Sequence, residues 1–292
     1  MGSSGEPGAA PLLRAKSYEQ HSLFEPEKLV REARRQLNLP SGDIPPVIVL
    51  DPDGDLVRYV RATRNLRRVR QWSCYHSTMW GLRVAGVSIG IVPNVVGGPY
   101  AVLVGEQAFA AGCRLLVDLT SAGRVAPLVQ LPPYFVVIEK AWRDEGTSLH
   151  YLAPTPWARA NPELLAALEG LPATAAGQPV LRGASWTTDA PFRETPDALA
   201  HAREAGTLAV EMEAASLYAF GTARNRPVLC VAHVTNDVVA VEAADFEKGD
   251  EGGAIAALEL LEKLILAVVS SGRIRVGTDR ASGGRQRTSR TR

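Results

Sequence analysis

The sequence TLAVEMEAASLYAFGTA, from Thr207 to Ala223, changes from a strand-like to a helix-like pattern of residues about halfway along its length. The first four residues are typical of a buried strand, and Ala214–Ala223 is typical of a helix. The next apolar run, VLCVAHV from Val228 to Val234, predicts another buried strand. A strand, a helix and a second strand in succession predict an α/β domain.

The same alternation continues toward both ends of the chain. Further strands are predicted at 47–50, 88–92, 114–119 and 134–140, and further helices at 101–111, 199–204 and 254–270. We therefore expect a single α/β domain whose central mixed, largely parallel, twisted sheet is flanked by helices on both faces. Ligands of such sheets bind beyond the carboxyl ends of the strands.

Composition sets the boundaries of this domain. Residues 1–15 are rich in Gly, Ser, Pro and Ala and are predicted to be disordered, residues 16–272 form the domain, and residues 273–292 form a disordered Arg-rich tail. The tail could contact anionic polymers, although a solvated tail is the simpler interpretation. The net charge of +1 over 292 residues gives no general electrostatic case for nucleic acid or membrane partners.

Other classes of protein are disfavoured by what the sequence lacks. The start of the chain has no signal-peptide pattern, and no apolar run has the roughly 20 residues that span a bilayer, so we expect a cytoplasmic protein. Three scattered cysteines predict buried free thiols rather than disulfides or a zinc site. The five histidines are dispersed, so no catalytic metal is expected.

Two acidic segments follow predicted strands. Glu211, Met212 and Glu213 lie at a strand-to-helix junction, where a carboxylate can accept hydrogen bonds from both hydroxyls of a ribose and Met can pack under the sugar. The alternative is that both acids only favour the helix dipole. Asp237 follows the strand that ends at Val234, where a desolvated carboxyl can act as a general acid, or else cap a turn.

Two further segments are candidates for binding. Between Gly183 and Thr195, the aromatic rings of Trp186 and Phe192 could stack on a planar base, and Arg193 could read its carbonyl groups. The alternative is a loop with two core aromatics. Thr120 and Ser121 begin a predicted turn of small residues, where backbone N–H groups can approach a ligand closely; such turns are common.

Together these segments resemble the nucleoside phosphorylase family, which includes uridine phosphorylase, hexameric purine nucleoside phosphorylase and methylthioadenosine nucleosidase. The resemblance runs from about His21 to Gly272 and is most specific at VEMEAASLY, Val210–Tyr218. Gly97-Gly98-Pro99 also matches, and Asp144–Tyr151 resembles uridine phosphorylase. The resemblance implies an enzyme that cleaves the N-glycosidic bond of a nucleoside and releases the free base.

The resemblance also implies roles for individual residues. Glu213 would bind the ribose hydroxyls, with Met212 and Glu211 beside it, and Thr120 and Ser121 would lie where sugar and phosphate meet. Trp186, Phe192 and Arg193 would lie near the base, and Asp237 would protonate the leaving base. His21 resembles a histidine that reaches the sugar in a neighbouring subunit, which implies a homo-oligomer with a shared active site.

The departures from the family concern the acceptor of the sugar. Phosphorolytic members hold phosphate with arginines, whereas here the segment after the first strand, Asp51–Leu56, is acidic, and Asp118 stands where a second arginine is expected. Carboxylates there would repel a phosphate dianion. Nucleosidase members use a carboxylate after the first strand to activate water, and Asp53 is the best-placed counterpart.

We therefore expect hydrolysis, with Asp53 as general base, Asp237 as general acid and no cofactor. Two alternatives stay open: a uridine- or purine-type phosphorylase that uses phosphate as a co-substrate with relocated ligands, and a non-catalytic nucleoside-binding protein. The sequence does not name the base, and relatives form both dimers and hexamers.

Overall fold

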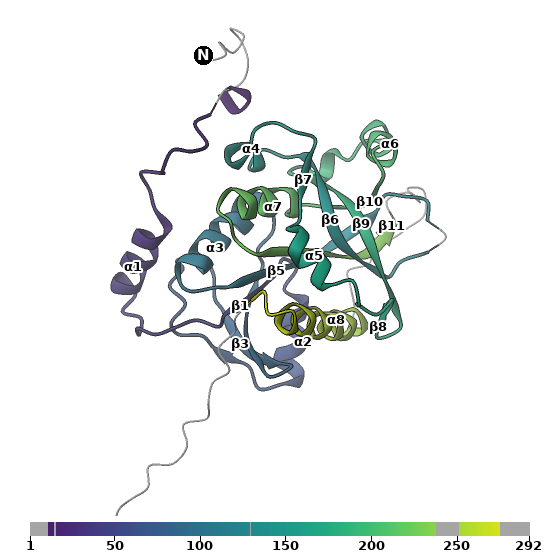
Figure 1. Cartoon of the computed structure of the whole chain (residues 1–292). Helices are drawn as coiled ribbons and strands as arrows, with labels where there is room; N and C mark the ends of the chain where they lie inside the picture. Colours follow the sequence, from purple (N-terminus) through teal and green to yellow (C-terminus); the bar gives the residue numbers. More distant parts are fainter. Residues whose placement is uncertain (1–10, 15, 129, 238–250, 275–292) are drawn as a thin grey trace, which may run out of the picture.

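The computed structural model of the chain describes residues 11–14, 16–128, 130–237 and 251–274. These residues form one mixed sheet with helices on both faces (Figure 1). The helices are α1 (Pro26–Gln36), α2 (Asp55–Thr63), α3 (Gly98–Ala110), α4 (Ser148–Tyr151), α5 (Pro162–Ala167), α6 (Pro196–Glu204), α7 (Ala214–Ala223) and α8 (Glu251–Ser270), with 3-10 helices η1 (Pro11–Leu13) and η2 (Pro191–Arg193). The strands are β1 (Val47–Asp51), β2 (Arg67–Arg68), β3 (Trp80–Val84), β4 (Val87–Pro93), β5 (Leu115–Arg124), β6 (Tyr134–Asp144), β7 (Trp157–Arg159), β8 (Thr174–Ala175), β9 (Gln178–Thr188), β10 (Thr207–Glu211) and β11 (Val228–Asp237).

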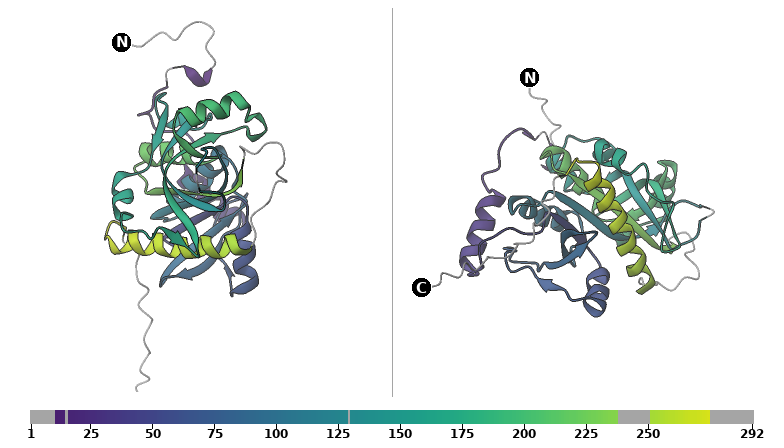
Figure 2. Two further views of the ribbon diagram at one scale, coloured as in Figure 1. Left: turned by 90° about the vertical axis from the view of Figure 1, so that its right-hand side faces the viewer. Right: turned by 60° about the horizontal axis from the view of Figure 1, so that its bottom comes forward.

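The sheet follows the order β10-β9-β6-β11-β5-β1-β4-β3-β2. Parallel pairs join β5 to β1 and to β11, while β6 runs antiparallel to β11, so the sheet is mixed as predicted. In addition, β10 pairs with β5 in an antiparallel bridge, Ala209 with Arg124 and Val210 with Gly123. This bridge closes β5, β11, β6, β9 and β10 into a barrel, which the left view of Figure 2 shows. The sequence did not predict this closure.

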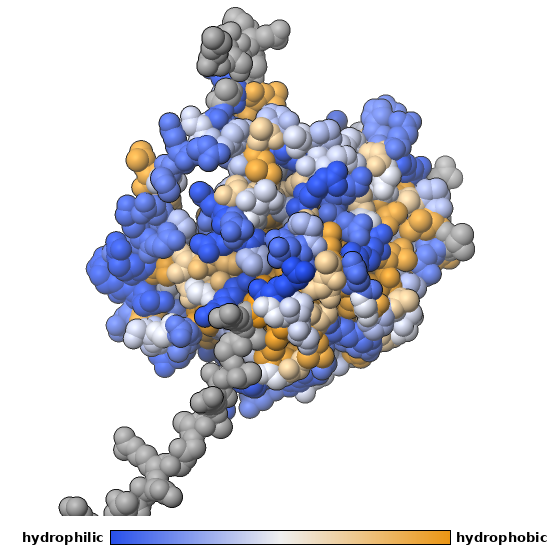
Figure 3. Space-filling model, viewed as in Figure 1, coloured by the Kyte–Doolittle hydropathy of each residue, from blue (hydrophilic) through white to orange (hydrophobic). Residues whose placement is uncertain are grey.

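Two apolar cores lie on the two faces of the sheet. Helices α3 and α7 pack together over one face, with α4 and α1 beside them. Helix α8 covers the other face with α2 and α5 (Figure 1). Strand residues alternate between the cores: Leu116 of β5 joins the first, and Leu115 and Val117 join the second. The face drawn in Figure 3 is broadly hydrophilic over α1.

Most of the predicted elements are confirmed, including the helix at Ala214–Ala223, which matches α7 residue for residue. The predicted turn at Thr120–Gly123 is wrong, because β5 continues to Arg124. Pairing with β10 and β11 holds this segment extended, which its small residues alone do not reveal. For the same reason Trp186 lies in β9, between β6 and β10, rather than in a loop.

The termini are described only in part. Residues 11–13 form η1 within the segment predicted to be disordered, while residues 1–10, residue 15 and the tail from 275 to 292 lie outside the described residues. Cys74, Cys113 and Cys230 are free and buried, as expected. In the described part of the chain, no helix combines the length and the apolar character needed to cross a bilayer.

Candidate active site

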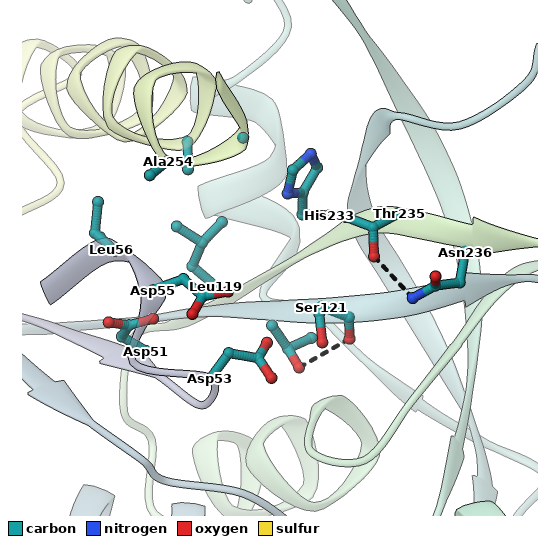
Figure 4. A pocket seen from close by; sticks show the side chains of 13 residues that line it. Asp51, Asp53, Asp55, Leu56, Leu119, Ser121, His233, Thr235, Asn236 and Ala254 are labelled. Carbon is teal, nitrogen blue, oxygen red and sulfur yellow. Dashed lines mark hydrogen bonds between the residues drawn. The ribbon is translucent and has the colours of Figure 1, made fainter. Parts of the chain in front are cut away.

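A cavity of about 210 Å³ opens where β1, β5 and β11 end. Its walls come from the β1–α2 connection, from β5 and β11, and from the first turn of α8 (Figure 4). The lining residues are Asp51, Asp53, Asp55, Leu56, Leu119, Thr120, Ser121, His233, Thr235, Asn236, Gly253, Ala254 and Ala257. This is the edge at which an open parallel sheet binds ligands, so the cavity is the candidate active site.

Three aspartates from the β1–α2 connection form the acidic wall of the cavity. Asp51 is buried, and its carboxylate accepts a hydrogen bond from the backbone N–H of Val57 at 2.8 Å. Burial raises the pKa of Asp51 to about 6, and the charges of Asp53 and Asp55 add to this shift. Asp53 is half-buried and points toward Ser121 across the cavity (Figure 4). A carboxylate in this position can take a proton from a water molecule held in the cavity.

Thr120 connects the cavity to the buried acid of the sugar motif. Its hydroxyl donates to Oε2 of Glu213 at 2.9 Å, while the residue itself lines the cavity. Glu213 is only 1% exposed and lies directly behind Thr120 instead of in the cavity wall. A ligand in the cavity would therefore meet Thr120 first and Glu213 immediately beyond it.

The carboxylate of Glu213 is held by backbone groups from two segments. Oε1 accepts the N–H of Gly97 at 2.6 Å, and Oε2 accepts the N–H of Met212 at 3.2 Å. Gly97 has φ of 88°, and a Cβ on Gly98 would lie 2.1 Å from Oγ of Ser216, so the two glycines allow α3 to approach α7 closely. The motifs around 97 and 213 are thus complementary parts of one structure.

The ionisation of Glu213 is strongly perturbed. Burial and, to a smaller extent, the charge of Glu211 raise its pKa to about 8, against hydrogen bonds that lower it. The carboxyl therefore carries a proton over part of the neutral range. Oε2 already accepts two hydrogen bonds, whereas Oε1 accepts one and keeps a lone pair for a further hydroxyl group, because each carboxylate oxygen offers about two acceptor positions.

Glu211 has a different environment from Glu213. Its Oε1 accepts the hydroxyls of Ser185, at 2.9 Å, and Thr187, and its Oε2 accepts the N–H groups of Glu213 and Ala214, both at 2.7 Å. These four bonds fix the start of α7. The structure therefore places Glu211 behind the site as a support, and its predicted contact with the sugar stays a prediction.

Asp118 is a buried acid with an unusual environment. It lies on β5 between Leu50 of β1 and Cys230 of β11, and it is fully buried. Neither of its oxygens has a hydrogen-bond partner among the described residues. Burial raises its pKa well above the ordinary value, and the charges of Glu213 and Glu211 add to the shift. Burial and the neighbouring charges therefore both favour the neutral form of the Asp118 carboxyl.

Sequence reasoning missed the polar wall that β11 contributes. His233, Thr235 and Asn236 line the cavity. Its ring stacks on Phe135 at 4.3 Å, and Nε2 lies 2.8 Å from Oε1 of Gln178. The period of two along β11 could have revealed this wall, because it places 233 and 235 on the same face.

Asp237 is the last residue of β11, and its backbone is paired with Arg124 of β5. Its side chain lies outside the described part of the chain. Its role as the acid that protonates the leaving base therefore stays a prediction.

The remaining candidates lie apart from this cavity. Trp186 is buried, and its Nε1–H donates to Asp144 at 3.0 Å. Phe192 and Arg193 are exposed on η2, with Phe192 99% exposed, and Met212 is half-buried. His21 is exposed in the segment before α1 (Figure 1). The structure brings Asp53, Thr120 and Ser121 together around the cavity, with Glu213 behind them.

The site is acidic and contains no fixed cation in its described part. None of the 13 residues that line the cavity is Lys or Arg. No group of three or more His, Cys, Asp or Glu side chains is arranged to hold a metal ion in the part of the chain that the structure describes. The arrangement can orient hydroxyl groups and transfer protons.

Comparison with solved structures shows the same fold in known enzymes. Uridine phosphorylase from Vibrio fischeri ES114 superposes with a TM-score of 0.61 and 22% identity, over 76% of this chain and 92% of that chain. The complex of the same enzyme with 6-hydroxy-1-naphthoic acid gives a TM-score of 0.59 and 22% identity, over 79% and 92%. A mixed sheet closed into a barrel, with its cavity at the strand ends, therefore defines a nucleoside phosphorylase fold.

The sequence gives the family directly. The family model described as the phosphorylase superfamily matches residues 47–270, which include every strand of the sheet and all of α8. The chain belongs to the phosphorylase superfamily and is an enzyme of the nucleoside phosphorylase type.

Proposed function

We propose that the protein cleaves the N-glycosidic bond of a nucleoside and transfers the sugar to water rather than to phosphate. The observation that carries this proposal is the acidic lining of the cavity. Asp51 ends β1, Asp53 follows it and Asp55 begins α2, and among the described residues that line the cavity none is Lys or Arg.

Electrostatics favour water in such a site. A phosphate dianion in a partly desolvated cavity needs positive partners, and it is repelled by carboxylates. Arg58 is the arginine nearest in sequence to the acidic wall, and it forms an ion pair with Asp55. Water has no charge and needs only a positioned base.

The proposed reaction assigns one role to each acid. Asp53 takes a proton from a water molecule as its oxygen bonds to C1′ of the sugar. The bond from C1′ to the base nitrogen breaks, its electron pair goes to the base, and Asp237 supplies the proton that the base needs. Glu213 and Thr120 hold the sugar hydroxyls, and water attack on an oxocarbenium-like sugar gains most of its rate from this positioning.

The test is chromatographic detection of released base from a panel of purine and pyrimidine nucleosides, with and without phosphate. We expect release at the same rate in both buffers and free ribose as the second product. Appearance of ribose 1-phosphate, with a rate that rises with phosphate, would replace the proposal with a phosphorylase. Binding of nucleosides without release of any base would identify a non-catalytic binding protein.

Two expectations extend the proposal beyond one subunit. We propose that His21 completes the sugar site of a neighbouring copy, since it is exposed in the segment before α1. Size-exclusion chromatography with light scattering measures the oligomer. A monomer with full activity would contradict the shared site.

A further inference from the structure

A second groove, of about 990 Å³, lies at the opposite edge of the sheet from the acidic cavity. Its walls come from the segments before β1 and β5, the segment after α2, and the β2–β3 pair. The N–H of Arg114 donates to the carbonyl of Pro46 at 2.7 Å, which holds the two walls that precede β1 and β5 together. The charged residues that line it are Arg64, Arg67, Arg68, Arg83, Arg114 and Asp43.

The groove concentrates positive charge on a chain that is nearly neutral overall. Five arginines face one aspartate there, whereas the whole chain carries a net charge of only +1. Arg64, Arg67 and Arg68 are exposed, and their side chains form no ion pair or hydrogen bond with other described residues. Arginines elsewhere on the surface differ, because Arg182 pairs with Glu139 and Arg224 with Glu106.

The chemistry of the lining identifies the class of ligand. A guanidinium group forms paired hydrogen bonds with phosphate oxygens and keeps its charge at every physiological pH. Among the described residues that line the groove there is no Phe, Tyr, Trp or His, so the groove offers no aromatic ring on which a base could stack. Recognition here must therefore depend on charge and on phosphate oxygens.

We propose that this groove binds a chain of linked phosphate groups. Its free arginines come from two elements, Arg64 from the end of α2 and Arg67 and Arg68 from β2, so a ligand that engages all three must extend along the groove. Linked phosphates provide charge at successive positions, whereas a single phosphate can occupy only one. The proposal is independent of the reaction in the acidic cavity.

The experiment is isothermal titration calorimetry of the full chain with inorganic triphosphate, orthophosphate, a nucleoside triphosphate and a short RNA. The test variant is Arg64→Gln/Arg67→Gln/Arg68→Gln, and a second variant, Arg64→Ala/Arg68→Ala, guards against a folding defect at β2. The control is Arg31→Ala/Arg35→Ala/Arg159→Ala, which removes three exposed arginines outside the groove. The wild type and all three variants keep the Arg-rich tail, so any binding by the tail contributes equally to each measurement.

We expect both groove variants to bind triphosphate at least about 10-fold more weakly than the wild type, and the control variant to bind it with unchanged affinity. The affinity of the wild type for triphosphate should fall as salt is added. Orthophosphate should bind more weakly than triphosphate. Equal triphosphate binding by wild type and groove variants would overturn the site, and equal binding of orthophosphate and triphosphate would overturn the linked-phosphate class. Tighter, groove-dependent binding of RNA would support the phosphate chemistry and assign its source to a nucleic acid backbone.

Discussion

The two ends of β1 and β5 carry opposite charges in opposite environments. Asp51 ends β1 and Asp118 lies within β5, and both side chains are buried. At their amino ends, Arg64, Arg67 and Arg68 are exposed around an open groove. The same two strands therefore separate an enclosed acidic site from an open basic one.

The difference between the two ends arises because carboxyl and guanidinium groups respond differently to burial. A carboxyl group can become neutral by binding a proton, which is why burial raises the pKa of Asp51 and of Asp118. A guanidinium group keeps its charge, so it must remain in water or meet an anion. The acidic end can consequently be closed around a neutral sugar, while the basic end has to stay open until an anion arrives.

The largest effect expected at the acidic end is the loss of the general base. Asp53→Asn should lower kcat by about 10²- to 10⁴-fold, because amide nitrogen and oxygen cannot accept a proton from water. The measurement is steady-state release of base. Asp43→Asn, the matched substitution in the basic groove, should leave kcat unchanged, and a similar loss in both variants would break the distinction between the two ends.

The second effect is a fall in stability as pH rises. Burial raises the pKa of Asp51 to about 6 and of Glu213 to about 8, above the ordinary values of 3.8 and 4.5. The folded chain therefore holds protons that the unfolded chain has already released. Stability from these protons is fully present below about pH 4 and is lost as pH rises toward about 8.

We expect the free energy of unfolding to decrease by roughly 2–5 kcal/mol from about pH 5 to about pH 8.5, as measured by urea denaturation. Asp118→Asn should flatten this decrease, since it removes a buried acid next to Glu213 and Glu211. Asp43→Asn should not change it, because Asp43 is exposed. Stability that rises over the same range would contradict the assignment of protonated buried acids.

A smaller effect should follow at the sugar contact. Glu213→Gln keeps the size of the side chain but replaces one acceptor oxygen with a donor, so the bonds from Gly97 and Thr120 cannot both be kept. We expect KM for a ribonucleoside to rise by about 10- to 100-fold, consistent with loss of one or two hydrogen bonds to the sugar. A matched deoxyribonucleoside should lose less, and equal losses would remove Glu213 from the sugar site.

The smallest effect is expected at the basic end. Arg64→Ala/Arg68→Ala should change the free energy of unfolding by no more than about 0.5 kcal/mol, because both side chains are exposed and make no ion pair with described residues. Urea denaturation measures this directly. A loss of several kcal/mol would show that these arginines support the fold rather than a ligand.

Sequence reasoning predicted elements well where a local pattern determines them. Val228–Val234 and Ala214–Ala223 carry a continuous apolar run and a helical one, and both appear as β11 and α7. Sequence reasoning was wrong where pairing with strands distant in the sequence determines the local secondary structure. Thr120–Gly123 has the composition of a turn, yet β10 and β11 hold it as strand β5.

The site shows the same limit. Asp53, Thr120 and Ser121 could be predicted because each follows or ends a strand that the apolar pattern reveals. Two features depend on how β5, β9 and β10 pack together. One is the position of Glu213 behind Thr120, and the other is the set of four hydrogen bonds that Glu211 accepts. Spacing along one chain carries no information about such three-strand junctions.

The barrel closes along one short seam, the antiparallel pairing of β10 with β5. Only two residue pairs, Ala209 with Arg124 and Val210 with Gly123, join β10 to β5, whereas four to nine pairs join the other neighbouring strands of the barrel. Directly after this seam the chain reaches Glu211 and Glu213. A substitution that opened the seam, such as a proline at Val210, would separate the acid of the sugar motif from Thr120 without altering any polar side chain. The integrity of the pocket therefore depends on the backbone pairing of two apolar residues.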